Sequence, residues 1–241
     1  MLASFLLAGI VVGQLAGAVE VTSLYTAEVP FNGSAANARE NAYRAALSVI
    51  LVRITGTTAA SESEELAAIF PNPAQFVTQF RPGPDDTLVV SMDGPELERV
   101  LKRAGAAVWG SERPLTVVWL AVDWGLGQRE IVAADDADNR PGAARSIDRN
   151  RLLRERVQEV ATRRGVPIVF PLMDTKDLQN IGFSDIWGGF DDQLLEASAR
   201  YEAPSVLVGR IRSDSGQPPR WTWYLGDSRF AWPGGPEQAI D

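Results

Sequence analysis

Two aspartates in this chain stand where a carboxylate could do chemistry. Asp123 and Asp174 each follow an apolar segment that we expect to form a strand. If those strands are parallel, both carboxylates emerge at the same carboxyl edge, where open α/β sheets usually hold ligands. Two acids there could bind a divalent cation or act as an acid/base pair. The alternative is that each aspartate caps the turn or helix that follows it.

A second candidate is the glycine-containing loop expected over residues 184–190, near the same edge. It carries Asp185, Trp187 and Phe190 around a pair of glycines. The two rings could form an aromatic pocket for a ligand or a protein. The alternative is that both rings fill the core beneath a glycine turn.

Arg210 is the third candidate, because it lies inside the apolar segment SVLVGRIR. A charge in a buried strand needs a partner, and an acid such as Asp174 on a neighbouring strand would serve. The alternative is that Arg210 faces solvent at the border of the sheet. The ligand-binding candidates are therefore Asp123, Asp174, Asp185, Trp187, Phe190 and Arg210.

Composition excludes several kinds of site. The 241 residues include no His and no Cys, which excludes Ser-His-Asp and Cys-His nucleophiles, thiol redox centres and His/Cys zinc sites. The 23 Lys+Arg against 31 Asp+Glu give a net charge of −8, which argues against a nucleic-acid partner. Gly125-x-Gly127 lacks the third glycine of a nucleotide loop. We therefore predict no cofactor, no metal site and no assigned catalytic residue.

The N-terminal segment indicates export. An apolar stretch over residues 2–12 is followed by Ala16-Gly17-Ala18, which resembles a signal-peptidase site after Ala18, although no Lys or Arg precedes the stretch. The alternative is an uncleaved anchor in the inner membrane, packing through Gly9, Gly13 and Gly17. We expect a signal peptide over 1–18 and a periplasmic or otherwise exported protein that meets the membrane only if this segment is retained.

The fold class that we predict is α/β, in two parts joined near residues 110–114. The first, over 19–110, is a small α+β domain: a strand ending at Pro30, a helix over 35–54, short helices over 62–70 and 73–80, a loop at RPGPDD, the strand TLVVSMD, and a helix beginning at Asp93-Gly94-Pro95.

The second part, over 114–226, is predicted as a β-α-β-α-β-β sandwich with a parallel sheet core. PLTVVWLAVD, VPIVFPLMD and SVLVGRIR are its three parallel strands, because they are apolar almost without alternation. A helix through Arg164, starting at Ser146 or Asp148, and a helix starting at Asp191-Asp192 connect them. WTWYL is expected to add an antiparallel strand. We expect residues 227–241 to be an irregular tail, either complete or truncated.

These blocks resemble a bacterial family of exported proteins known as a domain of unknown function, DUF2066. The resemblance rests on LYTAEVPF, ARENAYRAALSVILVRITG, VWGSERPLTVVWLAVD, RRGVPIVFPLMD, SDIWGGF and SARYEAPSVLVGRIR followed by WTWYL, which occur in the expected order from Leu24 to Leu225. It implies an exported α/β protein and assigns no activity and no site residues.

The first functional hypothesis is a non-enzymatic binding or scaffold module of the cell envelope with an envelope protein as partner. A scaffold needs an exposed apolar patch, expected around Trp221, Trp223 or Trp232. The alternative is a carboxylate- or metal-dependent hydrolase using Asp123, Asp174 and Asp185, whose acids must lie within about 4–6 Å of each other. A third hypothesis is a sensor of a small ligand held by Trp187, Phe190 and Arg210.

Overall fold

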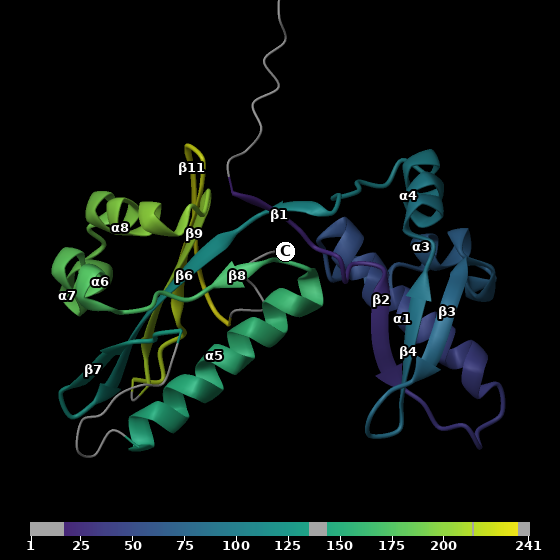
Figure 1. Ribbon diagram of the computed structural model, residues 1–241, viewed down its shortest axis with the longest axis horizontal. Helices are drawn as coiled ribbons and strands as arrows, with labels where there is room; N and C mark the ends of the chain where they lie inside the picture. The colour runs from purple at the N-terminus through teal and green to yellow at the C-terminus, as the bar shows by residue number, and fades with distance from the viewer. Residues whose placement is uncertain (1–16, 135–143, 214, 236–241) are drawn as a thin grey trace, which may run out of the picture.

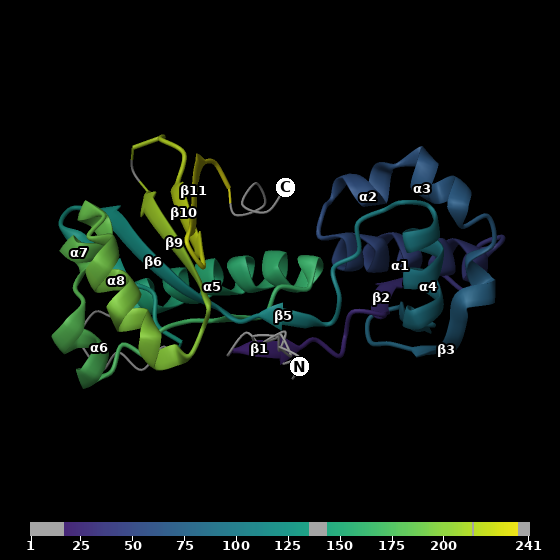
Figure 2. The same ribbon diagram turned by 90° about the horizontal axis from the view of Figure 1, so that it is seen from above.

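The computed structural model describes residues 17–134, 144–213 and 215–235, and it has the predicted α/β class. It consists of two parts side by side, one built around a three-stranded sheet and the other around a six-stranded sheet (Figure 1). A short ribbon of two strands, β1 (Ala18–Glu20) and β5 (Glu112–Pro114), lies between them (Figure 2). The expected signal segment lies outside the described residues except at its last two positions. Among the described helices, none has the length and apolar character needed to span a bilayer.

The first part packs helix α1 (Ala38–Thr55) on an antiparallel sheet of order β2-β4-β3. The strands are β2 (Thr26–Pro30), β3 (Val77–Pro82) and β4 (Thr87–Met92), with β4 in the centre. Helix α1 ends at Gly56 in the left-handed region (φ 79°), where the Gly56 N–H donates to the Val52 carbonyl. This is the ending that the sequence predicted.

Short helices connect these strands: α2 (Ala59–Glu62), α3 (Glu64–Ile69) and the 3₁₀ turn η1 (Pro73–Phe76). The predicted helix over 73–80 is wrong beyond Phe76, because β3 occupies 77–82. The RPGPDD loop is confirmed for residues 83–86, whereas its first two residues belong to β3. This strand lies at the edge of the sheet and is largely exposed, so its sequence carries no apolar alternation. Pairing with β4 decides its conformation.

Helix α4 (Gly94–Arg103) begins as predicted. The Asp93 carboxylate accepts a hydrogen bond from the Glu96 N–H, and Pro95 occupies the first turn. Leu97 and Leu101 are fully buried on its inner face. They join a core that draws only on residues of the first part.

The second part is a six-stranded mixed sheet of order β11-β10-β9-β6-β7, with β8 also paired to β6. The strands are β6 (Thr116–Gly125), β7 (Gln128–Ile131), β8 (Ile168–Val169), β9 (Ser205–Arg212), β10 (Arg220–Leu225) and β11 (Ser228–Pro233). Both β8 and β9 run parallel to β6, which confirms the predicted parallel core. Two strands were missed: β7, and β11, which lies in the segment expected to be an irregular tail.

Strand β8 is only two residues long because another segment occupies the rest of that edge of β6. Ile168 and Val169 pair with Thr116 and Val117 at the start of β6. Beyond that point the edge of β6 pairs with β7, and the Val132 N–H donates to the Leu120 carbonyl. The chain after β8 therefore leaves the sheet near the beginning of β6.

Helices cover both faces of this sheet (Figure 1). Helix α5 (Ala144–Arg164) packs on one face, against Val118, Leu120 and Val122 of β6. On the other face, Val117, Trp119 and Ala121 pack with α6 (Thr175–Asn180), α7 (Phe183–Gly188), α8 (Asp191–Ser198) and the turn η2 (Ala199–Tyr201). Alternate residues of β6 thus enter two separate cores, which explains its continuous apolar sequence.

Arg113 of β5 joins the two parts. Its side chain is fully buried and its guanidinium stacks on Trp109, with the carbon 4.1 Å from the ring centroid. It donates hydrogen bonds to five backbone carbonyls, those of Arg53, Trp109, Gly110, Arg164 and Gly165. Two of these acceptors lie at the C-terminal ends of α1 and α5, where helix dipoles favour a cation. Burial lowers the pKa of Arg113 to about 10, so it stays charged at neutral pH.

Candidate functional site

Asp123 ends the buried part of β6 at the carboxyl edge of the sheet, as expected. Its carboxylate accepts a hydrogen bond from the Gly125 N–H (3.1 Å) and pairs with Arg129 of β7 (Nε–Oδ2 3.3 Å). The alternative role, fixing the turn that follows the strand, is therefore the one seen. The Gly125-x-Gly127 segment forms the tip of the β6–β7 hairpin, with both glycines at positive φ.

Helix α7 replaces the loop expected over 184–190, and it lies over the same edge as Asp123. Trp187 stacks on Phe183 with ring centroids 5.1 Å apart. The guanidinium carbon of Arg129 lies 5.8 Å from the centroid of the Phe183 ring. The guanidinium carbon of Arg212 lies 5.3 Å from the centroid of the Trp187 ring. Trp187 therefore lies near Asp123, since Arg129 contacts both Asp123 and the ring on which Trp187 stacks.

Arg210 also lies at this edge, but its hydrogen-bond partners differ from the acid that the sequence predicted. Its Nε donates to the Ile186 carbonyl (2.6 Å) and its Nη1 donates to the Thr222 hydroxyl (3.2 Å). The proposed ion pair between Arg210 and Asp174 is wrong, because Asp174 pairs with Arg200. Burial lowers the pKa of the half-buried Arg210.

Asp185 and Phe190, the other residues of the 184–190 candidate, have different roles. Asp185 accepts a hydrogen bond from the Gly182 N–H (2.8 Å) and so closes the first turn of α7. Phe190 is 54% exposed, which contradicts the alternative that both rings fill the core. Only Trp187 packs against the core, where it is partly buried.

Asp174 lies at a different place from Asp123, which corrects the prediction of a shared edge. Asp174 caps α6, accepting from the N–H groups of Lys176 and Asp177 (both 3.1 Å). It also forms a two-pronged ion pair with Arg200 (2.7 and 2.9 Å). These contacts hold the pKa of Asp174 well below its usual range, so it stays ionised and is a poor proton donor.

Asp174, Asp177, Arg200 and Tyr201 form a cluster, called the Asp174 cluster below, which packs nearer the beginning of β6. The buried Asp177 accepts hydrogen bonds from Tyr201 (2.5 Å) and Arg200 (2.8 Å), and the Tyr201 ring packs edge-on against Trp119, with centroids 6.2 Å apart. Trp119 precedes Asp123 by four residues, about 13 Å along an extended strand. Asp123 and Asp174 are therefore held by different arginines in different surroundings.

Tyr201 should report on this cluster in an alkaline titration. Burial and the hydrogen bond to Asp177 raise its pKa to about 12. Because the pKa of Tyr201 is raised on folding, its protonated phenol stabilises the folded protein below pH 10. This contribution to the free energy of unfolding is lost as the pH rises from about 10 to 12. We expect Tyr201→Phe to remove one phenol from the late step of the 295 nm absorbance titration. A midpoint near 10 for that phenol would contradict the hydrogen-bonded arrangement.

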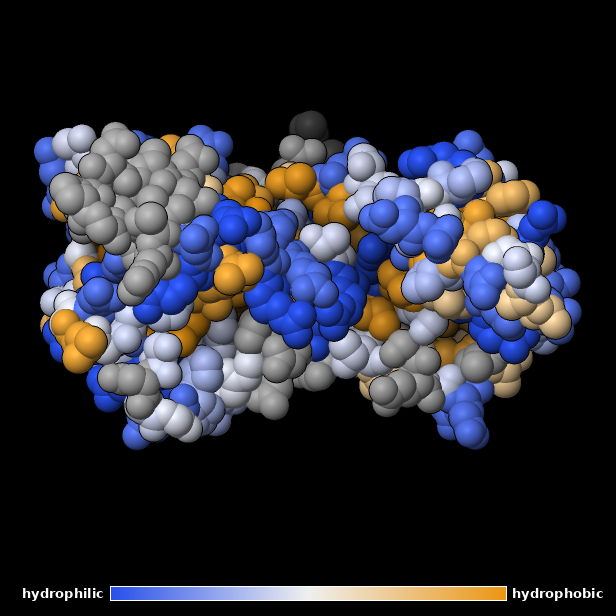
Figure 3. Space-filling view, turned by 90° about the horizontal axis from the view of Figure 1, so that it is seen from below, coloured by the Kyte–Doolittle hydropathy of each residue, from blue (hydrophilic) through white to orange (hydrophobic). Residues whose placement is uncertain are grey.

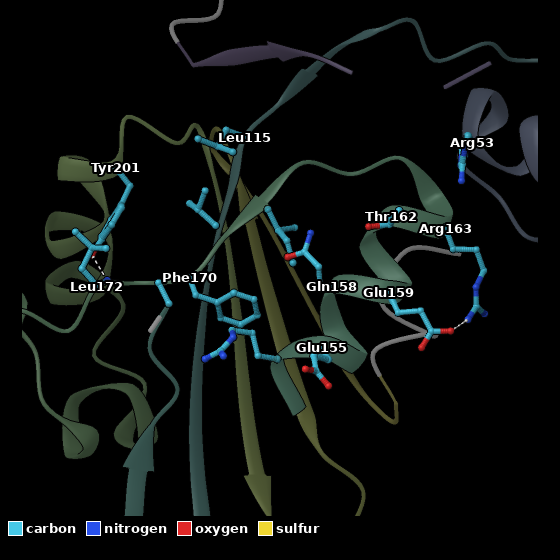
Figure 4. Close-up of a pocket in the computed structure, with 14 residues that line it drawn as sticks. Arg53, Leu115, Glu155, Gln158, Glu159, Thr162, Arg163, Phe170, Leu172 and Tyr201 are labelled. Carbon is cyan, nitrogen blue, oxygen red and sulfur yellow. Dashed lines mark hydrogen bonds and ion pairs between the residues drawn. The ribbon is translucent and has the colours of Figure 1, made fainter. Parts of the chain in front are cut away.

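A large cleft lies beside α5, and no prediction from the sequence pointed to it. Its volume is about 1000 Å³, at the upper end of the range for ligand sites. Figure 4 shows α5 side chains on one side, and Phe170, Leu172 and Tyr201 on the other. The apolar lining residues are Leu115, Ala134, Ile168, Val169, Phe170 and Leu172.

The two walls of the cleft differ in chemistry. The α5 wall carries Glu155, Gln158, Glu159, Thr162 and Arg163, with Glu159 and Arg163 paired at 3.0 Å. On the opposite wall Leu172 is 53% exposed. Seen from the α5 side, hydrophilic residues cover the middle of the molecule and separate apolar patches flank it (Figure 3). The cleft is therefore suited to holding an amphipathic partner.

Of the tryptophans expected to form an exposed patch, Trp221 is buried, whereas Trp223 and Trp232 are partly exposed. Trp221 is 1% exposed and Trp232 packs partly buried against the same core. Trp223 donates its Nε1–H to the Ser205 hydroxyl (2.6 Å). Exposed apolar surface is present on Phe230, whose ring centroid lies 5.9 Å from that of Trp223, and on Leu172 in the cleft.

The described residues contain no group of three or more acidic side chains placed to hold a metal ion. Comparison with family models matches residues 18–110 to a domain of unknown function, DUF8605. This family is a different one from DUF2066, so the resemblance inferred from the sequence blocks is corrected. The matched segment covers less than half of the chain and excludes both the cleft beside α5, apart from Arg53, and the edge of β6. Comparisons with curated proteins and with solved structures found no match.

Proposed function

We propose that this protein is an exported, non-enzymatic binding or scaffold module of the cell envelope, and that the cleft beside α5 receives its partner. The observation that carries the proposal is the cleft itself, with one apolar and one charged wall. Export is supported by the apolar N-terminal stretch and the small residues that follow it.

The contacts made by the three candidate carboxylates support binding rather than hydrolysis. Asp123 is paired with Arg129, Asp174 is paired with Arg200, and Asp185 closes a helix turn. Each carboxylate therefore has a structural partner. The polar wall of the cleft likewise pairs Glu159 with two arginines, Arg156 and Arg163.

Photocrosslinking in intact envelopes tests this function. A photoreactive residue in place of Gln158, on the α5 wall, should give a discrete crosslinked product with one envelope protein. The matched control replaces Leu126, which is fully exposed at the tip of the β6–β7 hairpin. The same products from both positions, or none from Gln158, would contradict the proposal.

A further inference from the structure

Four arginines gather on one face of the six-stranded sheet at its carboxyl edge. Arg220 of β10 lies directly opposite Arg210 of β9. Arg212 lies two residues further along β9, opposite Asp123, which in turn lies opposite Arg129 of β7. Register partners point to the same face of a sheet, and this is the face that carries α7. The edge therefore concentrates positive charge.

The acids around this edge do not balance that charge. Asp123 forms an ion pair with Arg129, and Asp191 forms one with Arg229 at 3.2 Å. Asp191 also attracts Arg210 electrostatically, so these two carboxylates face five arginines. Within the described residues, Arg210, Arg212 and Arg220 form no ion pair. Like charges directly opposite each other on a sheet are destabilising. In a chain of net charge −8, such a group of unpaired arginines indicates a site for an anion.

Two of these guanidinium groups are already held in position. Arg210 is fixed through Nε and Nη1 by Ile186 and Thr222, which leaves its Nη2 without a protein acceptor among the described residues. That Nη2 lies beside Gly189, where an added Cβ would be 3.5 Å away. Arg212 is held against the Trp187 ring. Groups fixed before binding lose less entropy when a ligand arrives.

We propose that Arg210, Arg212 and Arg220 bind a phosphate group, as a phosphate monoester or as free phosphate. A phosphate monoester carries a charge of about −1.5 to −2 and three strong acceptor oxygens, which suits several guanidinium donors better than a single carboxylate does. The exposed Phe190 ring lies beside Gly188, and the next residue, Gly189, lies beside Arg210, so Phe190 can contact the organic part of an ester. This site is on the sheet face opposite α5 and does not rest on the function proposed for the cleft.

Calorimetric titration of the full chain with inorganic phosphate, phenyl phosphate and acetate at equal ionic strength tests the proposal. We expect saturable binding of phosphate, weakened by about tenfold or more in Arg220→Gln, because a charge-assisted hydrogen bond is lost. Arg44→Gln is the matched control, since Arg44 is an exposed arginine on α1 far along the chain. Tighter binding of phenyl phosphate would assign the site to an ester, and equal binding would assign it to free phosphate.

Arg210→Gln provides the second variant, with circular dichroism to show that it folds. It should weaken phosphate binding as Arg220→Gln does. The proposal is overturned if wild type shows no saturable binding of either phosphate, if acetate binds as tightly, or if Arg44→Gln loses as much affinity as Arg220→Gln.

Discussion

Arg113→Met should lower the free energy of unfolding by at least about 3 kcal/mol, since buried carbonyls left without donors are costly. The five carbonyls that Arg113 serves come from both parts of the molecule, and the side chain is fully buried. Methionine fills the space of the stem but donates no hydrogen bond. Urea unfolding, followed by tryptophan fluorescence and by circular dichroism, measures the loss.

Arg103→Met is the control for this substitution, because Arg103 is an exposed arginine in the last turn of α4. Its effect should stay within about 0.5 kcal/mol, as for most surface substitutions. We also expect the fluorescence and circular dichroism unfolding curves of Arg113→Met to have different midpoints, because the ends of α1 and α5 lose their common hydrogen-bond donor. A stability close to wild type in Arg113→Met would show that Arg113 does not join the two parts.

Trp119→Ala should cost about 3–5 kcal/mol, the range for truncating a large buried aromatic side chain. Trp119 is fully buried in the middle of β6. It donates its Nε1–H to the Ser198 hydroxyl (2.8 Å) and packs against Tyr201, so it ties the central strand to the end of α8. Chemical denaturation at neutral pH gives the change in stability.

Ser198→Ala separates the hydrogen bond of Trp119 from its packing. It removes the acceptor of the indole N–H and should cost about 1 kcal/mol. If Trp119→Ala proved no more destabilising than Ser198→Ala, packing of this ring would not hold α8 on the sheet.

The sequence predicted most elements of the fold whose signals are local. Helix α1 followed from apolar spacing and its end from Gly56, and the start of α4 followed from Asp93-Gly94-Pro95. The parallel alignment of β6 with β8 and β9 followed from their unbroken apolar runs, because strands covered on both faces need no polar side. These features depend on residues close together in the chain.

Features that depend on distant partners were missed. The apolar run of VPIVFPLMD gave no sign that β7 would take the remaining edge of β6 and limit β8 to two residues. For the same reason Asp174 left the sheet near the start of β6 and met Arg200, 26 residues away in the chain. Nothing around Arg113 indicated burial, since its acceptors are backbone carbonyls up to 60 residues away.

The candidate site was predicted only in part. Asp123, Trp187 and Arg210 do lie at one edge, connected through Arg129, Arg212 and the Ile186 carbonyl. The cleft was not predicted, because its walls come from α5 and from the segment after β8, which the sequence treats as separate elements. A charged helix face such as that of Glu155 and Glu159 looks like ordinary solvated surface.

Single-cysteine protection most directly tests whether the cleft is a binding surface, and the absence of native Cys makes the labelling specific. Gln158→Cys and Leu126→Cys would be labelled with a maleimide in intact envelopes and in the purified protein. We predict slower labelling of residue 158 in the envelope than in the purified protein, with equal rates at residue 126. Equal rates in both settings at residue 158 would contradict a partner in the cleft.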